Sequence, residues 1–454
     1  MSLPQSTCTL IVGAGPTGLA TALSLIHHGF RDFVIVDAVT KGQNTSCAII
    51  IHAATTEALD TIGCADDLVA TGTKLPFFTL ATRSIATLVW VPFELLKPYT
   101  KYPYGLVIPQ LLTEHILEQK LASFGVTVHR PCRVIGMKPN SSNTKLADVT
   151  FEDGQVITAK YIIAADGARS TIRSIAGINF VDPSKEDNNT TIKQVALANV
   201  TFDDENLDGF PTIGILSPGN YFLCVSFPST FTEYLANETG KPIKGRIFRL
   251  STSVPNGGNI PSSPSKEYMQ NLVNTHGPLE LSSDPSVNPS SKSVRIKDVI
   301  WSSRFRTHCA IANTFFTRLP TGDASDPQGP AILLVGDAAH MHSPAGGQGM
   351  NLGLWDAIFL GEALTKHINA AETQPLSNAD IILTSFTAGR RSLALEIVGF
   401  MKRLLSITGV EDEGVAWWLP ISKVVLRDWV LWVLGKVWFI QRMWVWNMSG
   451  LGRR

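Results

Sequence analysis

The first forty residues alternate short apolar runs with a helical pattern. Thr9–Gly13 is apolar and β-prone, Thr17–His28 carries small and apolar residues at helical spacing, and Phe33–Asp37 is a second apolar run. Gly29 follows the helical segment, and glycine readily takes the left-handed conformation that ends a helix. The pattern predicts a strand, a helix and a strand in one βαβ unit. Met1–Thr9 has no basic segment, so we expect no signal peptide.

Two later apolar runs also lead into a glycine and an acid. Tyr161–Ala164 precedes the Asp-Gly pair at 166–167, and Ala331–Val335 precedes the Gly-Asp pair at 336–337. We expect both runs to be further strands of the same sheet. Other predicted strands are 126–130 and 147–152, and the predicted helices are 55–62, 111–124, 350–368 and 379–405.

The stretch between residues 191 and 251 has a different pattern. Four short segments alternate apolar and polar residues with no helical segment between them, which predicts an antiparallel layer inserted in the first domain. Residues 251–293 are rich in Ser, Pro, Asn and Gly, and there we expect exposed loops around one helix near 267–273. The predicted segments of the chain are 1–178, 179–305, 306–410 and 411–454.

Composition narrows the class of protein. The 454 residues are 44% hydrophobic and 17% charged, which is typical of a globular chain and excludes disorder of the whole chain. Basic and acidic residues balance at 38 each, so no overall positive charge indicates a nucleic-acid partner. The six cysteines lie far apart without a Cys-x-x-Cys pair, which favours a reducing, cytoplasmic setting over disulfides or a cysteine zinc site.

The last forty residues form a basic segment rich in tryptophan. Residues 415–454 hold seven of the ten tryptophans and carry a net charge of +5. Their apolar residues cover nearly every direction of a helical wheel, and charged residues interrupt them, so neither a one-sided surface helix nor a spanning helix fits. Two interpretations stay open. The tail packs on the body, or residues 415–446 seat it at a membrane surface and deliver a lipophilic substrate.

The turn after the first predicted strand has three glycines with distinct roles. Gly13 permits a tight turn, Gly15 lets a pyrophosphate approach the backbone, and Gly18 allows the helix to pack closely on the strand. The helix start offers N–H donors to phosphates. Asp37 stands 19 residues beyond Gly18, where an acid accepts the ribose hydroxyls of an adenosine and repels a 2′-phosphate. Such a turn is typical of both FAD and NAD sites.

Two further motifs favour FAD. Residues 165–173 read Ala-Asp-Gly-Ala-Arg-Ser-Thr-Ile-Arg, and residues 336–351 begin Gly-Asp-Ala-Ala-His and end Gly-Gly-Gln-Gly-Met-Asn. With the glycine turn they resemble the group A flavoprotein monooxygenases, the para-hydroxybenzoate hydroxylase and phenol hydroxylase superfamily, over about residues 9–410. Pattern and resemblance together predict an α/β fold: a Rossmann-type FAD-binding domain with an inserted antiparallel β-sheet substrate domain and a C-terminal helical tail.

The resemblance implies cofactor contacts at matching positions. Asp337 would accept a hydrogen bond from a ribityl or ribose hydroxyl of FAD. Asp166 and Gly167 would serve the FAD pyrophosphate and the nicotinamide donor, and Gln110 would contact FAD. Arg173 is an open case between a phosphate and a surface carboxylate.

The third motif also has a direct electrostatic interpretation. Residues 344–349 hold a proline and three glycines before a predicted helix, and N–H groups at a helix start stabilise negative charge. A reduced flavin is anionic at its pyrimidine edge, so this loop should hold the ring and favour its reduction. The residues predicted to bind FAD in this motif are Gly336, Asp337, Pro344, Gly347, Gly349, Met350 and Asn351.

Four other residues qualify this expectation. His340 and His342 have no third ligand at metal spacing, so no metal site is predicted. The family usually carries arginine at the positions of Cys47 and Ala54, and here both residues are uncharged. The absence of both arginines predicts that the FAD phosphates are less well neutralised, or that Lys41 or an arginine elsewhere neutralises them instead.

The resemblance implies a redox enzyme. NAD(P)H reduces FAD, O2 adds to the reduced ring, and the C4a-(hydro)peroxide hydroxylates a phenolic or other electron-rich aromatic small molecule. Tyr221, Arg246 and Arg249 are the catalytic or substrate candidates in the expected antiparallel layer. Three alternatives stay open: an isoprenoid epoxidase on the same scaffold, a catalytically impaired FAD-binding protein, and an NAD-dependent dehydrogenase, which would leave the 336–351 motif unexplained.

Overall fold

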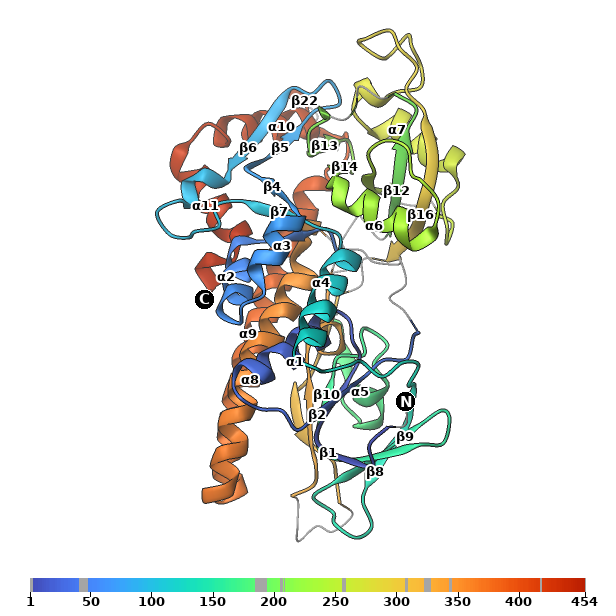
Figure 1. Ribbon diagram of the computed structural model, residues 1–454. Helices are drawn as coiled ribbons and strands as arrows, with labels where there is room; N and C mark the ends of the chain where they lie inside the picture. The colour runs from blue at the N-terminus through green and yellow to red at the C-terminus, as the bar shows by residue number, and fades with distance from the viewer. Residues whose placement is uncertain are drawn as a thin grey trace.

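The computed structural model describes residues 3–40, 48–183, 194–204, 207, 209–254, 259–306, 309–321, 328–342, 345–416 and 419–453 (Figure 1). Within these residues, two seven-stranded sheets lie toward opposite ends of the molecule, and long helices run along one side. In this described part of the chain, no helix combines the length and the apolar character needed to cross a membrane.

The first sheet is built from the apolar runs that alternate with helices. Its strands are β1 Ser6–Val12, β2 Phe33–Val36, β8 Val134–Pro139, β9 Ala147–Phe151, β10 Val156–Ala164, β18 Phe316–Arg318 and β19 Ala331–Leu334. The order β2-β1-β10-β19 is parallel, while β18 and the β8–β9 pair add antiparallel strands. The central strands are buried, as expected for a parallel sheet covered on both faces.

The second sheet forms the layer at the top of Figure 1. Its strands are β5 Phe77–Ala81, β6 Thr87–Pro92, β12 Gln194–Phe202, β13 Ile213–Ser217, β14 Asn220–Ser226, β15 Phe248–Ser253 and β16 Ile296–Arg306. They stand in the order β16-β12-β15-β14-β13-β5-β6, and every pair except β13–β5 is antiparallel.

Side chains alternate between the two faces of this second sheet. Phe222 and Leu250 pack with the buried residues of α7 (Lys266–His276) on one face. Tyr221 and Arg249, their neighbours in sequence, therefore lie on the opposite face. Tyr221 contacts the large hydrophobic cluster that also contains Met350 of α8 (Gln348–Thr373), so this opposite face is turned toward the first layer.

The second layer differs from the sequence-based expectation in two ways. A helix does intervene, because α6 (Ser229–Thr239) lies between β14 and β15. Its apolar signal is weak, since Phe231 and Leu235 are its only buried residues. In addition, β5 and β6 belong to the part of the chain that precedes the predicted insertion, yet they join this sheet. The strand expected at 126–130 is wrong: a single bridge from His129 to Val36 replaces it, and Pro131 has no N–H to extend a ladder.

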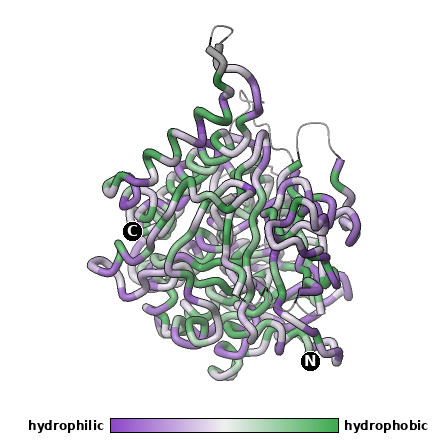
Figure 2. The backbone as a smooth tube through the Cα atoms, turned by 90° about the horizontal axis from the view of Figure 1, so that it is seen from above, coloured by the Kyte–Doolittle hydropathy of each residue, from purple (hydrophilic) through white to green (hydrophobic). Residues whose placement is uncertain are grey.

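Shorter elements complete the described part of the chain. The helices are α1 Pro16–His27, α2 Ala53–Thr61, α3 Ala65–Thr71, α4 Gln110–Ser123 and α5 Thr171–Ile175, with 3-10 turns η1 Phe93–Leu96, η3 Leu279–Leu281, η4 Gly336–Ala338 and η5 Ala345–Gly347. The short strands are β3 Ile50–Ile51, β4 Thr73–Leu75, β7 Gly105–Val107, β11 Phe180–Val181, β17 Ala310–Ala312 and β20 His340–Met341. In Figure 2 hydrophobic positions run through the middle of the molecule, and hydrophilic ones are frequent along its outline.

The C-terminal part is mainly helical. After α8, α9 (Leu376–Thr408) runs back along it, and a hairpin of β21 (Gly414–Ala416) and β22 (Leu419–Ser422) follows. The last elements are α10 Lys423–Leu434, α11 Trp438–Ser449 and the 3-10 turn η6 Leu451–Arg453. α10 and α11 both pack against β6. The predicted α/β fold with an antiparallel layer and C-terminal helices is confirmed.

Candidate cofactor-binding site

The glycine turn brings the first motif against the second. Gly13 has a φ of 103°, and a Cβ there would lie 2.2 Å from the carbonyl oxygen of Ala165. A Cβ on Gly18 would lie 1.9 Å from the Gly13 carbonyl oxygen. Gly15 has open surroundings, since its nearest neighbour would be Glu114 Oε1 at 4.0 Å. α1 begins directly after Gly15 without a side-chain cap, so its first amides can receive an anion.

Charged side chains flank this turn. The carboxylate of Asp37, at the end of β2, accepts hydrogen bonds from the backbone N–H of Ala14 at 2.6 Å and of Val39 at 2.9 Å. Arg130, which the sequence analysis missed, donates to Glu118 at 2.6 Å and to the Ala14 carbonyl at 3.4 Å. Asp37 therefore orders the turn, and Arg130 brings a positive charge to it.

Gln110 is hydrogen-bonded to Glu114, a carboxylic acid that lies beside the glycine turn. Its Nε2 donates to Glu114 Oε1 at 2.7 Å, one helical turn further along α4. Burial raises the pKa of Glu114 to about 7, against the opposing effect of the hydrogen bond from Gln110. Glu114 is the residue nearest to a Cβ built on Gly15, so an ionisable group adjoins the turn that the sequence analysis did not single out.

Asp166 combines a structural and a ligand-directed oxygen. Its Oδ2 caps α5 by accepting from the N–H of Thr171 at 2.8 Å and of Ile172 at 3.2 Å. Its Oδ1 is buried and has no hydrogen-bond partner among the described residues. Burial raises the pKa of Asp166, and the hydrogen bonds oppose that rise. Gly167 follows with a φ of 79°. A buried acceptor without a partner is what a bound ligand would satisfy.

Arg173 links the second motif to the third. It is 7% exposed and donates to the carbonyl oxygens of Ala338 at 2.9 Å and Ala168 at 2.8 Å. Its guanidinium also lies 3.8 Å from the centre of the Phe180 ring. These contacts join the two motifs through the backbone.

The third motif meets the first at Thr17. Gly336, with a φ of 59°, would place a Cβ 2.6 Å from Thr17 Oγ1, and Gly353 of α8 would do the same. Asp337 follows Gly336 at the end of β19 and is exposed. Desolvation by the surrounding protein raises its pKa, and His340 acts in the opposite direction. Because water still reaches the Asp337 carboxyl, a ligand hydroxyl can reach it as well.

A buried charge network supports the Gly336–Asp337 turn from behind. Asp356 of α8 accepts hydrogen bonds from the Gly336 N–H at 3.2 Å and from Arg390 Nε at 2.7 Å, and it is hydrogen-bonded to His340 Nε2. Burial opposes the charged form of Asp356, yet His340 and Arg390 together hold its pKa below the ordinary value. The sequence analysis did not single out Asp356, because it lies on a separate element from His340.

The glycine loop before α8 has consecutive left-handed residues. Gly346 and Gly347 have φ values of 71° and 63°, and no side chain caps the helix that follows. Asn351 Nδ2 donates to the carbonyl oxygens of Gly347 at 2.6 Å and Ile50 at 3.0 Å, and its Oδ1 accepts from the His52 N–H at 2.8 Å. The carbonyl oxygens of the loop thus accept hydrogen bonds from the protein, which leaves the backbone N–H groups at the helix start for a ligand.

His52 completes this support and was missed by the sequence analysis. Its Nε2 lies 3.0 Å from the Gly346 carbonyl oxygen, which can only accept, so the neutral ring carries its proton on Nε2. Burial lowers the pKa of His52 to about 4, so the ring is uncharged at neutral pH. Of the loop residues predicted to bind FAD, Asn351 and Met350 are buried and support the loop, Gly349 is half-buried, and Pro344 lies outside the described residues.

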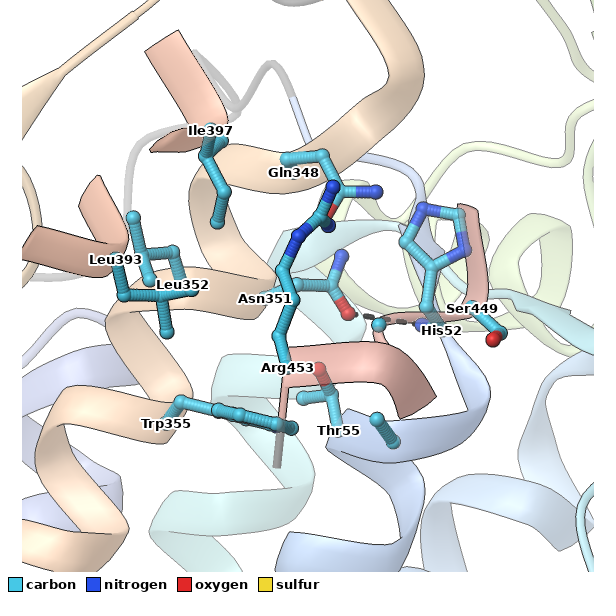
Figure 3. A pocket seen from close by; sticks show the side chains of 12 residues that line it. His52, Thr55, Gln348, Asn351, Leu352, Trp355, Leu393, Ile397, Ser449 and Arg453 are labelled. Carbon is cyan, nitrogen blue, oxygen red and sulfur yellow. Dashed lines mark hydrogen bonds between the residues drawn. The ribbon is translucent and has the colours of Figure 1, made fainter. Parts of the chain in front are cut away.

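A small cavity lies behind the loop, where Figure 3 shows Arg453 between Gln348 and Trp355. It is also lined by Ala54, one of the positions where the family usually has arginine; the other, Cys47, lies outside the described residues, as does Lys41. Arg453 is held by Glu396 at 3.4 Å and by the Asn447 carbonyl at 3.1 Å. An arginine from the far end of the chain thus stands beside Ala54, bound to protein groups.

The three substrate candidates occupy different places. Arg249 is buried, donates to Asn199 Oδ1 at 2.6 Å and lies over the Trp301 ring at 4.9 Å, on the face that is turned toward the first layer. Tyr221 shares this face, and burial raises its pKa to about 12 against a hydrogen bond with Ser251. Arg246 precedes β15 and donates to Ser226 Oγ at 3.0 Å, so it lies beyond one end of that strand, whereas Tyr221 lies toward the other end.

Comparisons with known proteins fit this geometry. A family model described as "FAD binding domain" matches residues 6–217 and 324–385. The unmatched stretch between them holds β14, β15, α7 and β16 of the second layer. The chain therefore belongs to the FAD-binding family of the group A flavoprotein monooxygenases, as its motifs predicted.

The relatives compared in sequence are named as monooxygenases. The chain is 28% identical over 352 residues to 6-methylpretetramide 4-monooxygenase of Streptomyces rimosus, an alignment that covers 77% of this chain and 54% of the relative. It is 30% identical over 369 residues to an uncharacterized aromatic compound monooxygenase of Bacillus subtilis, covering 80% and 62%. The chain thus spans little more than half of the length of these relatives.

Solved structures share the fold. The p-nitrophenol 4-monooxygenase of Pseudomonas putida superposes with a TM-score of 0.74 at 20% identity, covering 99% of both chains. An anhydrotetracycline hydroxylase of Streptomyces rimosus superposes with a TM-score of 0.69 at 24% identity, covering 98% of this chain and 76% of the other. At this level of identity the comparison shows the fold alone.

The residues present fit FAD. Uncapped helix starts at α1 and α8 suit a pyrophosphate and the electron-rich edge of a reduced flavin. The exposed carboxyl of Asp337 and the buried Oδ1 of Asp166 lie on the turns that meet them. Contacts through Gly13, Ala165, Thr17 and Gly336 bring all three motifs together.

Proposed function

We propose that this protein is an FAD-dependent monooxygenase that hydroxylates a phenolic or other electron-rich aromatic small molecule, with NAD(P)H as electron donor and O2 as the oxygen source. The observation that carries the proposal is the convergence of the three motifs, the second meeting the first at Gly13 and the third meeting it at Thr17, with two uncapped helix starts in the first and third motifs. The family match and the names of the relatives support the same class of reaction.

Bound FAD would supply the redox chemistry, by accepting a hydride and activating O2. The chain's own residues bind and orient it. Free amides at the start of α8 stabilise negative charge at the flavin ring, Asp337 accepts from a sugar or ribityl hydroxyl, and Asp166 Oδ1 accepts from a second donor group. Asn351 and His52 fix the loop so that its amides need no rearrangement during the reaction.

The inner face of the second sheet is turned toward the first layer, and in this proposal it supplies the substrate side of the site. On this face lies Tyr221, a neutral phenol at neutral pH whose pKa burial raises further, to about 12. It can therefore exchange a hydrogen bond with an aromatic hydroxyl. Arg249, stacked on Trp301, favours an electron-rich or anionic ring nearby. Tyr221 and Arg249 are our candidates for orienting the substrate. Arg246 is a third and weaker candidate, because it precedes β15 and is not part of the strand.

The test is a turnover assay in two stages. The purified, FAD-loaded protein should lose its visible flavin bands when NADPH or NADH is added under nitrogen and regain them in air. A panel of phenols and indoles should then be screened for substrate-dependent NAD(P)H oxidation coupled to a hydroxylated product. Bleaching without any hydroxylated product, with all electrons recovered as hydrogen peroxide, would contradict the monooxygenase proposal and favour a catalytically impaired FAD-binding protein.

A further inference from the structure

The last two helices bury only one side of their surface. Val424 and Arg427 of α10 and Val445 of α11 are buried, and the turn between the helices approaches β6 closely. A Cβ on Gly435 would lie 2.8 Å from the Leu88 carbonyl oxygen. These contacts attach the pair to the edge strand of the second sheet, so packing on the body accounts for the inner side alone.

The outer side of the pair exposes large apolar residues. Val425 is 60% exposed, Trp429 61%, Trp438 59% and Phe439 63%. Val425, Trp429 and Trp432 are spaced as one face of a helix. We call the set the outer face; its exposed members are Val425, Leu426, Trp429, Val430, Trp432, Trp438, Phe439 and Met443. Exposed apolar residues clustered on neighbouring helices indicate a binding surface, unlike scattered single ones.

Positive charge is interleaved with these aromatic rings. The Lys436 ammonium lies 3.6 Å from the centre of the Trp432 ring, and the Arg442 guanidinium lies 5.6 Å from that of Trp438. Between residues 421 and 453 the sole acid is Asp428, and it is bonded to Arg427 at 2.8 Å. Lys436 and Arg442 form no ion pair with the described residues. With these cations beside it, the outer face has the tryptophan, aliphatic and basic composition that suits a layer of anionic headgroups above acyl chains.

We propose that the outer face of α10 and α11 binds the surface of a lipid bilayer that contains anionic lipids. Each helix has 12 residues and is too short to span, so both would lie in the plane of the interface. A second copy of the chain fits less well. A two-fold interface would place this basic face against an identical basic face, with few carboxylates to pair Lys436 and Arg442.

Binding to vesicles tests this proposal with the full-length, flavin-loaded protein. It should co-sediment with vesicles of phosphatidylcholine and phosphatidylserine, more weakly with phosphatidylcholine alone, and more weakly again as salt is raised. The double variant Trp429→Gln/Phe439→Gln should bind the anionic vesicles about tenfold or more weakly, because it removes two exposed aromatic anchors. Lys436→Glu should weaken binding to the anionic vesicles alone.

A matched control separates this surface from general hydrophobicity. Ile381 on α9 is 64% exposed and lies outside the outer face, so Ile381→Gln should leave vesicle binding unchanged. All variants should keep their flavin content and thermal transition, because the substituted side chains are exposed. Failure of the wild-type protein to bind either kind of vesicle would overturn the proposal. So would equal binding by the double variant, or a concentration-dependent dimer in sedimentation analysis that the double variant abolishes.

Discussion

Two aspartates have different roles at the turn after β19. Asp337 is exposed, while Asp356 is 2% exposed and holds the same turn through the Gly336 N–H. His340 connects them, since it is hydrogen-bonded to Asp356 and opposes the rise in the pKa of Asp337 that desolvation causes. We expect substitutions at the two positions to differ: one should change ligand binding, the other the stability of the turn.

Asp337→Ala should weaken FAD binding without unfolding the protein. A hydrogen bond to a charged group contributes about 1.5 to 3 kcal/mol, so the dissociation constant should rise about 10- to 100-fold. Fluorescence titration of the cofactor-free protein with FAD measures this, and circular dichroism monitors the fold. Asp66→Ala, at an exposed acid of α3, is the control. An unchanged affinity for FAD would remove Asp337 from the site.

Glu114 predicts a pH dependence of stability. Its folded pKa of about 7 lies above the value near 4.3 of an unfolded glutamate, so the folded state binds a proton more tightly. The associated stabilisation is complete below the unfolded pKa and is lost as pH rises through the folded one. Glu114→Gln removes the titrating group and with it this loss of stability. The free energy of unfolding of the variant, relative to that of the wild type, should therefore increase by about 2 to 3 kcal/mol between pH 5 and pH 8.

Urea unfolding of the cofactor-free proteins at both pH values checks the Glu114 prediction. Glu372→Gln, at an exposed position of α8, should show no such change. A stability difference between Glu114→Gln and wild type that stays constant from pH 5 to pH 8 would show that Glu114 titrates normally in the folded protein.

At the scale of elements, the loop of η5 and the start of α8 determine how a flavin could be held. Gly346 and Gly347 are left-handed, and Asn351 and His52 tie their carbonyl oxygens. The C-terminal segment supports the same loop from behind, because Gln348 Nε2 donates to the Met448 carbonyl at 3.1 Å. The loop is thus fixed from three elements, α2's N-terminal flank, α8 itself and α11.

Gly347→Ala should damage this loop. A left-handed conformation costs a residue with a Cβ about 1 to 2 kcal/mol, and that Cβ would lie 2.5 Å from Ile50 Cγ2. We expect at least about tenfold weaker FAD binding, measured by the same titration. Gly389→Ala is the matched control in α9, where nothing lies within 4 Å of the added Cβ. It should raise thermal stability slightly and leave FAD affinity unchanged. Similar effects of both variants would contradict the role of the loop.

The sequence predicted those elements whose signal is local. The βαβ unit and the long helices follow from apolar spacing, and observed bounds differ by a few residues. α6 escaped prediction because its buried pair, Phe231 and Leu235, is too short a pattern. His52 and Asp356 escaped because their roles depend on partners about 300 and 16 residues away, contacts that only the folded chain creates.

At the scale of the whole molecule, the candidate site lies where two layers meet. The first sheet positions the three motifs, and the inner face of the second sheet carries Tyr221 and Arg249. The orientation of the second sheet could not be predicted from the sequence, because alternation shows which side chains share a face but not which face meets the first layer. The basic tail was open between two interpretations, and the structure shows packing on one side with an exposed outer face on the other.

The central claim is tested most directly by adding FAD to the cofactor-free protein and measuring how much FAD stays bound. The protein should be mixed with excess FAD, desalted and examined by visible absorption and circular dichroism. We predict the bands of oxidised flavin at a stoichiometry of one FAD per chain, with an induced visible dichroism that shows a ring held in an asymmetric site. A natively folded protein that emerges colourless from desalting would contradict the account.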